Sequence, residues 1–75
     1  MRHVEFDLRA LFEALDARRH ERALTWADVA SELRGFTPDM LRNLAKGGRI
    51  GVPRVMRLVR WLGRPAVDFT RIAAW

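Results

Sequence analysis

Apolar residues recur at helical spacing in the first third of the chain. Four of them follow the i, i+3, i+4, i+7 spacing that places side chains on one face of an α-helix, namely Leu8, Leu11, Phe12 and Leu15. Asp7 stands just before them and is a suitable N-cap, because a carboxylate accepts a hydrogen bond from a free N–H of the first turn. The pattern predicts a helix that begins near Leu8 and fades within the polar run 17–22. The alternating apolar residues at 4, 6 and 8 are too few to predict a strand.

Threonine marks the starts of two further helices. Thr25 and Asp28 form a capping-box-like pair, in which each side chain caps the backbone N–H of the other residue. Thr37 is followed by Pro38, a residue favoured at the first helical position. The third helix then runs for about ten residues before the glycine pair 47–48 ends it. A helix this short is unstable alone, so packing must hold it.

The second and third helices are joined by residues 34–36 only. A turn this short forces the two helices to cross at a steep angle, and the second of them can project from the domain. The spacing predicts a helix-turn-helix at about residues 25–46.

The rest of the chain predicts two more helices. The fourth begins at Gly51 or Val52 and ends at Gly63. A fifth, short helix is expected after Pro65, and it contains three apolar residues, Val67, Phe69 and Ile72. We therefore expect an all-α, compact five-helix bundle that forms a single domain, 1–75.

Positive charge is concentrated in the second half of the chain. Residues 1–33 hold five basic and seven acidic side chains, whereas residues 34–75 hold nine basic and two acidic ones, for a net charge of +5. A basic half beside a nearly neutral one favours a polyanionic partner. An arginine-rich composition that only improves solubility would give the same sums.

The third helix has a polar outer side. Leu41 and Leu44 fall together on a helical wheel, and the opposite side carries Asp39, Arg42, Asn43 and Lys46. Arginine and asparagine match guanine and adenine edges in the major groove, and a lysine near the helix end suits a phosphate contact. Any solvated helix shows a similar side, including an acid–arginine pair at i, i+3.

Four arginines gather beside Trp61 in the polar arc of the fourth helix and just after it: Arg54, Arg57, Arg60 and Arg64. No acidic residue of that helix neutralises them, so we expect them to repel one another unless an anion is supplied. The glycine pair before Arg49 adds backbone N–H groups that can approach a phosphate closely.

The order of these features resembles the helix-turn-helix of the XRE family, the lambda-repressor-like domains. The resemblance covers about residues 8–72 and rests on the stretch Leu24-Thr25-Trp26-Ala27-Asp28-Val29-Ala30, then Leu33, Gly35, Thr37, Leu41, Leu44 and Gly47, and the tail LVRWLGRPAVDF. It implies a five-helix fold and a transcriptional regulator that binds DNA as a dimer. It also implies that Trp26 and Ala27 lie near the phosphate backbone, with five recognition-helix positions facing DNA: Thr37, Pro38, Asp39, Arg42 and Asn43.

Two departures from the family pattern concern this surface. One residue, Arg34 or Gly35, is extra in the turn. Pro38 and Asp39 occupy places where the family often has polar donors, and an aspartate repels phosphate. Asp39 either accepts from a cytosine amino group or caps the helix and holds Arg42, and we favour the second interpretation.

Other chemistry has little support in the sequence. There is no cysteine, and His3 and His20 lack the neighbours of a metal site. Ser31 has no nearby histidine to activate it, and no carboxylates are paired for acid–base work. We therefore expect that the chain is not an enzyme and that it binds no metal or cofactor. Neither a membrane span nor a signal peptide is evident, so a cytoplasmic location is the expectation.

We therefore expect a sequence-specific binder of double-stranded DNA, most simply a repressor. Arg42 and Asn43 would discriminate between bases, while Lys46, Arg49 and Arg54 would contact phosphates. A homodimer is expected, because large apolar residues near the C-terminus have little core to join, and these are Phe69, Ile72 and Trp75. The alternatives are a protein-interaction module that kept the fold without DNA reading, or an antitoxin or excisionase-like protein.

Overall fold

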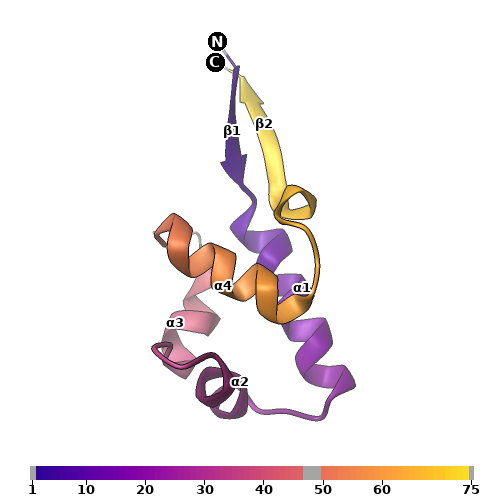
Figure 1. The fold of residues 1–75 in the computed structure, drawn as a ribbon, viewed down its shortest axis with the longest axis vertical. Helices are drawn as coiled ribbons and strands as arrows, with labels where there is room; N and C mark the ends of the chain where they lie inside the picture. The colour runs from indigo at the N-terminus through magenta and orange to yellow at the C-terminus, as the bar shows by residue number, and fades with distance from the viewer. Residues whose placement is uncertain (1, 47–49, 75) are drawn as a thin grey trace.

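The computed structural model describes residues 2–46 and 50–74, and side chains within residues 4–46 and 50–72. Its elements in chain order are β1 (Arg2–Phe6), α1 (Leu8–Glu21), α2 (Trp26–Leu33), α3 (Pro38–Arg42), the 3-10 helix η1 (Asn43–Lys46), α4 (Val52–Leu62), the 3-10 helix η2 (Ala66–Phe69) and β2 (Thr70–Ala74). The helices form a body, and β1 and β2 extend from it as a ribbon that carries both ends of the chain (Figure 1). No helix among the described residues is long and apolar enough to cross a membrane.

The predicted helix starts are confirmed by the capping hydrogen bonds. Asp7 accepts from the backbone N–H of Ala10 at 3.0 Å, and Thr37 accepts from that of Met40 at 3.2 Å. Thr25 and Asp28 form a complete capping box. These side chains satisfy N–H groups that the first turn of a helix leaves without an intrahelical partner.

The fourth helix also has the predicted bounds. It begins after Gly51 and ends at Gly63, whose φ of 67° is left-handed, the conformation that glycine adopts without steric cost. The third helix differs in detail, because only its first turn is α-helical and its second half is the tighter η1. The glycine pair expected to end it lies outside the described residues.

The predicted all-α five-helix bundle is wrong. The described residues hold four α-helices, and the segment expected to form a fifth consists of η2 followed by a strand. β2 pairs antiparallel with β1, from Phe6 opposite Thr70 to Arg2 opposite Ala74. Glu5 and Arg71 face each other in this register and form an ion pair at 2.7 Å. The ribbon joins segments from opposite ends of the sequence, so local periodicity carries no sign of it.

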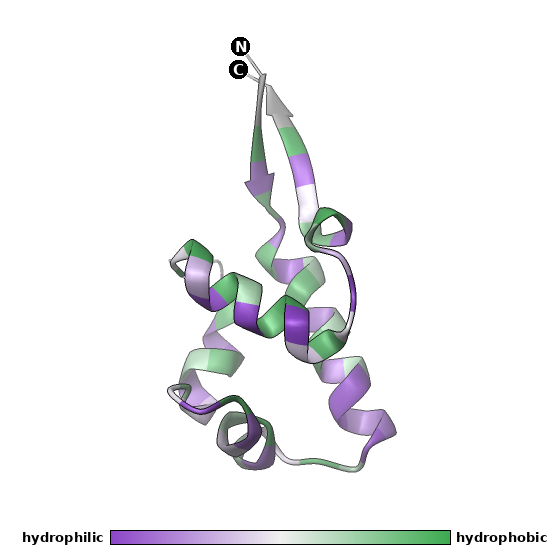
Figure 2. Cartoon of the chain, viewed as in Figure 1, coloured by the Kyte–Doolittle hydropathy of each residue, from purple (hydrophilic) through white to green (hydrophobic). Residues whose placement is uncertain are grey.

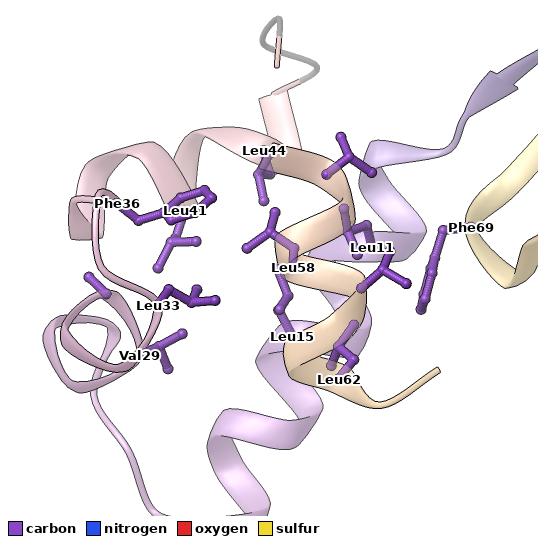
Figure 3. Packing of buried hydrophobic residues seen from close by; sticks show 13 residues of the cluster. Leu11, Leu15, Val29, Leu33, Phe36, Leu41, Leu44, Leu58, Leu62 and Phe69 are labelled. Atoms are coloured by element: carbon purple, nitrogen blue, oxygen red, sulfur yellow. The ribbon is translucent and has the colours of Figure 1, made fainter. Parts of the chain in front are cut away.

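The core lies between α1, α4 and the helix pair α2 and α3 (Figure 3). Thirteen hydrophobic residues are buried in it: Leu11, Leu15, Val29, Ala30, Leu33, Phe36, Leu41, Leu44, Val55, Leu58, Val59, Leu62 and Phe69. Figure 3 shows Leu58 near the centre, with Leu11 of α1 and Phe69 on one side and the side chains of α2 and α3 on the other. Because α3 contributes Leu41 and η1 contributes Leu44 to this core, packing fixes a helical segment too short to be stable alone.

Phe69 joins the ribbon to the body. Its side chain is 2% exposed and packs in the core, and its carbonyl oxygen accepts the backbone N–H of Asp7 at 2.6 Å. It was expected at a dimer interface, but its burial within its own chain leaves it no surface to offer a partner.

Replacing this phenylalanine tests its place in the core. We expect Phe69→Ala to lower the free energy of unfolding by about 3–5 kcal/mol, the usual cost of truncating a buried phenylalanine. Val67 in the same 3-10 helix is 70% exposed, and Val67→Ala is expected to change stability by less than about 0.5 kcal/mol. Urea unfolding followed by circular dichroism measures both. Equal effects would contradict the packing described above.

Candidate nucleic-acid interface

The third helix presents its polar side to solvent. Leu41 is fully buried and Leu44 is 4% exposed, so both face the core as predicted. The four polar residues of the opposite side are all exposed: Asp39, Arg42, Asn43 and Lys46. Within the described residues no other element covers this side, and α3 lies at the edge of the body (Figure 1). The outer side of this helix is therefore open to contact with another molecule.

Asp39 and Arg42 are joined on this exposed side. The guanidinium of Arg42 donates to the carboxylate of Asp39, and their side chains stay 53% and 80% exposed. Thr37 caps the helix, while Asp39 lies in its first turn. Asp39 therefore holds Arg42, which is one part of the interpretation favoured from the sequence.

The turn between α2 and α3 is held by an arginine of α4. Arg57 donates from Nη2 to the carbonyl oxygens of Leu33 and Arg34, the latter at 2.6 Å. Arg34 and Gly35 both have positive φ, 55° and 79°. A left-handed backbone at an arginine persists only where its surroundings hold it.

The other arginines of the predicted basic group lie in different places. Arg54 is beside α3, where it donates to the sulfur of Met40 at 3.9 Å. Arg64 forms a hydrogen bond with Asp68 at 3.2 Å and stacks on Phe69. Arg60 is exposed in the last turn of α4. The basic group is therefore divided, and among its described members only Arg54 adjoins the exposed side of α3.

A pocket of about 380 Å³ separates α3 from the start of α4. Its lining is mainly apolar, with a polar residue from each side, and consists of Phe36, Met40, Asn43, Leu44, Ile50, Gly51 and Arg54. The guanidinium of Arg54 lies 5.9 Å from the ring centre of Phe36, and that of Arg57 lies 5.3 Å from it. The pocket places the amide of Asn43 and the charge of Arg54 around one opening.

The start of α2 carries a negative charge where the family resemblance implied a phosphate contact. The carboxylate of Asp28 accepts the backbone N–H of Thr25 at 2.9 Å, and this bond and the one to the Thr25 hydroxyl lower the pKa of Asp28. Trp26 stacks on Phe12 at 5.4 Å and lies under the guanidinium of Arg19. Trp26 thus contributes to packing, while Ala27 is exposed.

Trp61 belongs to a cluster away from α3. Arg22 binds Glu32 through two hydrogen bonds of 2.8 and 2.9 Å, and the indole N–H of Trp61 donates to the same carboxylate at 3.1 Å. The bonds from Arg22, then the one from Trp61, lower the pKa of Glu32, and the same pairing raises the pKa of Arg22. This cluster joins the end of α1 to α2 and α4.

Four remaining residues from the sequence analysis are placed as follows. Lys46 ends η1 and is exposed. Ile72 is 67% exposed on the ribbon. Arg49 and Trp75 lie outside the described residues.

Comparisons with known proteins found no match for this chain among protein-family models, curated proteins or solved structures. Within the described residues, no three metal-ligating side chains come together.

The Glu32 cluster predicts a pH dependence of stability. A carboxylate whose pKa is lowered by folding stabilises the fold above its ordinary pKa, and this contribution is lost as the pH falls through the lowered value. The stability difference between wild type and Glu32→Gln is therefore expected to be largest near neutral pH and to vanish in strong acid. Urea unfolding at a series of pH values, followed by tryptophan fluorescence, measures it. A pH-independent difference would contradict this role. Glu13→Gln, in a longer surface ion pair of 3.6 Å, is the control.

Removing the arginine at the turn is expected to destabilise the fold. Arg57→Ala leaves two carbonyl groups without their charged donor. A hydrogen bond to a charged group contributes about 1.5–3 kcal/mol to the free energy of unfolding. We expect a loss in that range for Arg57→Ala and a smaller one for Arg57→Lys, because lysine keeps the charge without the planar fork. Arg60→Ala removes the same charge from the same helix and is expected to change stability by less than about 0.5 kcal/mol. Chemical unfolding that ranks Arg60→Ala above Arg57→Ala in cost would refute the assignment.

Proposed function

We propose that this chain binds double-stranded DNA sequence-specifically, with α3 and η1 entering the major groove, and that it regulates transcription. The observation that carries the proposal is the uncovered outer side of this short helix, which holds Arg42 and Asn43 while Leu41 anchors the opposite side in the core. An α-helix fits the major groove, where each base pair has its own pattern of donors and acceptors.

Two side chains of this surface suit direct base reading. The guanidinium of Arg42 matches the two acceptors of guanine, and the amide of Asn43 matches the donor and acceptor of adenine. Arg42 is already held by Asp39, which limits its rotamers before DNA arrives. Binding guanine then requires the guanidinium to share or exchange this carboxylate.

Arg54 and Lys46 suit phosphate contacts at the edges of the same surface. Arg54 is exposed in the first turn of α4, next to Met40 of α3, and Lys46 is exposed at the end of η1. Contacts with phosphate position a protein without reading sequence, and each makes binding weaker as salt rises. The net charge of +5 acts in the same direction.

The resemblance to the XRE family supports a regulator that acts as a homodimer on two half-sites. In this proposal the chain works by occupying an operator, and it needs no catalytic group or cofactor.

A protein-interaction module is the second candidate, because the pocket beside α3 has an apolar lining that DNA does not need. Phe36, Met40 and Ile50 offer apolar surface there, and Arg54 offers one charge. An apolar side chain next to an acidic one on a protein partner would fit this opening. This candidate predicts no retention of duplex DNA at physiological salt.

Selection of bound sequences from a random duplex pool, followed by titration of selected and random duplexes, tests the proposal. We expect Arg42→Ala to lower the affinity for selected DNA by about tenfold or more and to change the affinity for random DNA little, because a good base contact contributes about 1–3 kcal/mol. We expect Arg54→Ala to lower the affinity for both duplexes by the same factor. The slope of log affinity against log salt concentration should become shallower by about 0.9.

Arg60→Ala is the matched control for this experiment. It lowers the net charge by the same amount and lies on the same helix, almost two turns beyond Arg54. If all three variants lowered the affinity for both duplexes equally, the assigned roles would be wrong and only the net charge of the protein would matter. If the wild type enriched no sequence and bound no duplex at moderate salt, DNA binding itself would be refuted.

A further inference from the structure

The ribbon of β1 and β2 carries apolar surface that the helical body does not cover. Val4 and Ile72 lie opposite each other in the register, and their side chains are 66% and 67% exposed. Figure 2 shows apolar stretches on both strands, away from the helices. Two β-branched side chains paired at a site open to water gain little from burial in a single chain.

The hydrogen-bond pattern shows which backbone groups face outward. The N–H of Asp7 donates to the carbonyl of Phe69 at 2.6 Å, next to the pair Phe6 and Thr70. Bonded and non-bonded pairs alternate along an antiparallel ladder, so Val4 and Ile72 form a non-bonded pair. The backbone N–H and C=O of Val4 therefore point away from β2, toward the outer edge of the ribbon. Among residues 2–46 and 50–74 no third strand lies at that edge.

We propose that a second copy of this chain binds this edge, so that two β1 strands pair antiparallel about a twofold axis at Val4. The inference deepens the homodimer of the proposed function by naming its surface. It concerns association of the protein alone, so it succeeds or fails independently of DNA binding.

Such pairing completes what the ribbon lacks. A two-stranded ribbon is only marginally stable in water, whereas three or more strands with an apolar face are stable. The twofold arrangement makes a sheet in the order β2, β1, β1, β2. Its central row is Ile72 and Val4 of one copy followed by Val4 and Ile72 of the second, four β-branched side chains in contact.

The charge pattern favours the edge of β1 over the edge of β2. A twofold axis at Val4 sets position 5 of one copy opposite position 3 of the other, which is a glutamate against a histidine in the sequence. It sets position 2 opposite position 6, an arginine against a phenylalanine, so no like charges meet. Self-pairing of β2 about Ile72 sets Arg71 opposite an alanine and brings no opposite charges together. Cross-strand pairs of opposite charge stabilise a sheet and like pairs destabilise it.

Single cysteines test the geometry, because the natural chain has none. Under mild oxidation we expect Val4→Cys to form a disulfide-linked dimer, since the residue meets its own copy at a Cα separation of about 5.5 Å, within disulfide range. Ile72→Cys lies on the outer strands of the proposed sheet and is expected to cross-link at least tenfold more slowly. Val67→Cys, 70% exposed outside the ribbon, gives the background rate. Faster cross-linking through Ile72→Cys, or equal rates for all three, would overturn the proposed edge.

Oligomeric state without DNA provides the second test. Sedimentation equilibrium of the wild type is expected to show a dimer of the 8.7 kDa chain at micromolar concentrations. Val4→Lys and Ile72→Lys are each expected to raise the dimer dissociation constant at least tenfold, and Val67→Lys to leave it unchanged. Far-ultraviolet circular dichroism confirms that each variant keeps its helices. A wild type that stays monomeric at high micromolar concentration, or a Val67→Lys variant that dissociates equally, would refute the proposal.

Discussion

Arg57 binds the carbonyl oxygens of Leu33 and Arg34, the acceptors at the end of α2, and so fixes where the chain turns into α3. The turn needs such a donor, because it uses a left-handed backbone at an arginine and leaves polar groups at a helix end. The guanidinium of Arg57 also lies over the ring of Phe36, which is buried just beyond the turn. α3 has too few residues to be stable by itself. Its orientation on the body therefore follows from this contact and from the burial of Leu41 in the core.

Signals that act within a few residues were readable from the sequence. Thr25, Thr37 and Asp7 begin helices because each side chain satisfies an N–H three residues ahead. Gly63 ends α4 because a left-handed residue is needed there. The positions of Leu41 in α3 and Leu44 in η1 were predictable for the same reason, since the helical period fixes which residues share a side. The exposed polar side of the candidate site follows directly from these local rules.

Contacts between distant segments were not readable in this way. The fifth helix was predicted from three apolar residues, yet Ile72 lies in a strand, because β2 forms only where β1 provides its partner, more than sixty positions earlier. The arginines of α4, and Arg64 just after it, were expected to repel one another, but Arg57 and Arg64 have partners in the turn and in η2. A helical wheel gives the direction of a side chain and not the element that meets it, so the charge pattern alone overstated the basic surface.

The ion pair between Asp39 and Arg42 bears on how the proposed surface would discriminate among DNA sequences. An exposed pair of this kind contributes at most about 1 kcal/mol, so a guanine that offers two acceptors can replace the carboxylate at small cost. A phosphate also competes for the guanidinium, but its approach brings two negative groups together. If the proposed function holds, Asp39 would therefore weaken contacts that read no sequence more than it would weaken a base contact made by Arg42 within the groove. In the proposed function, an aspartate that lowers total affinity in this way would widen the difference in affinity between an operator and random DNA.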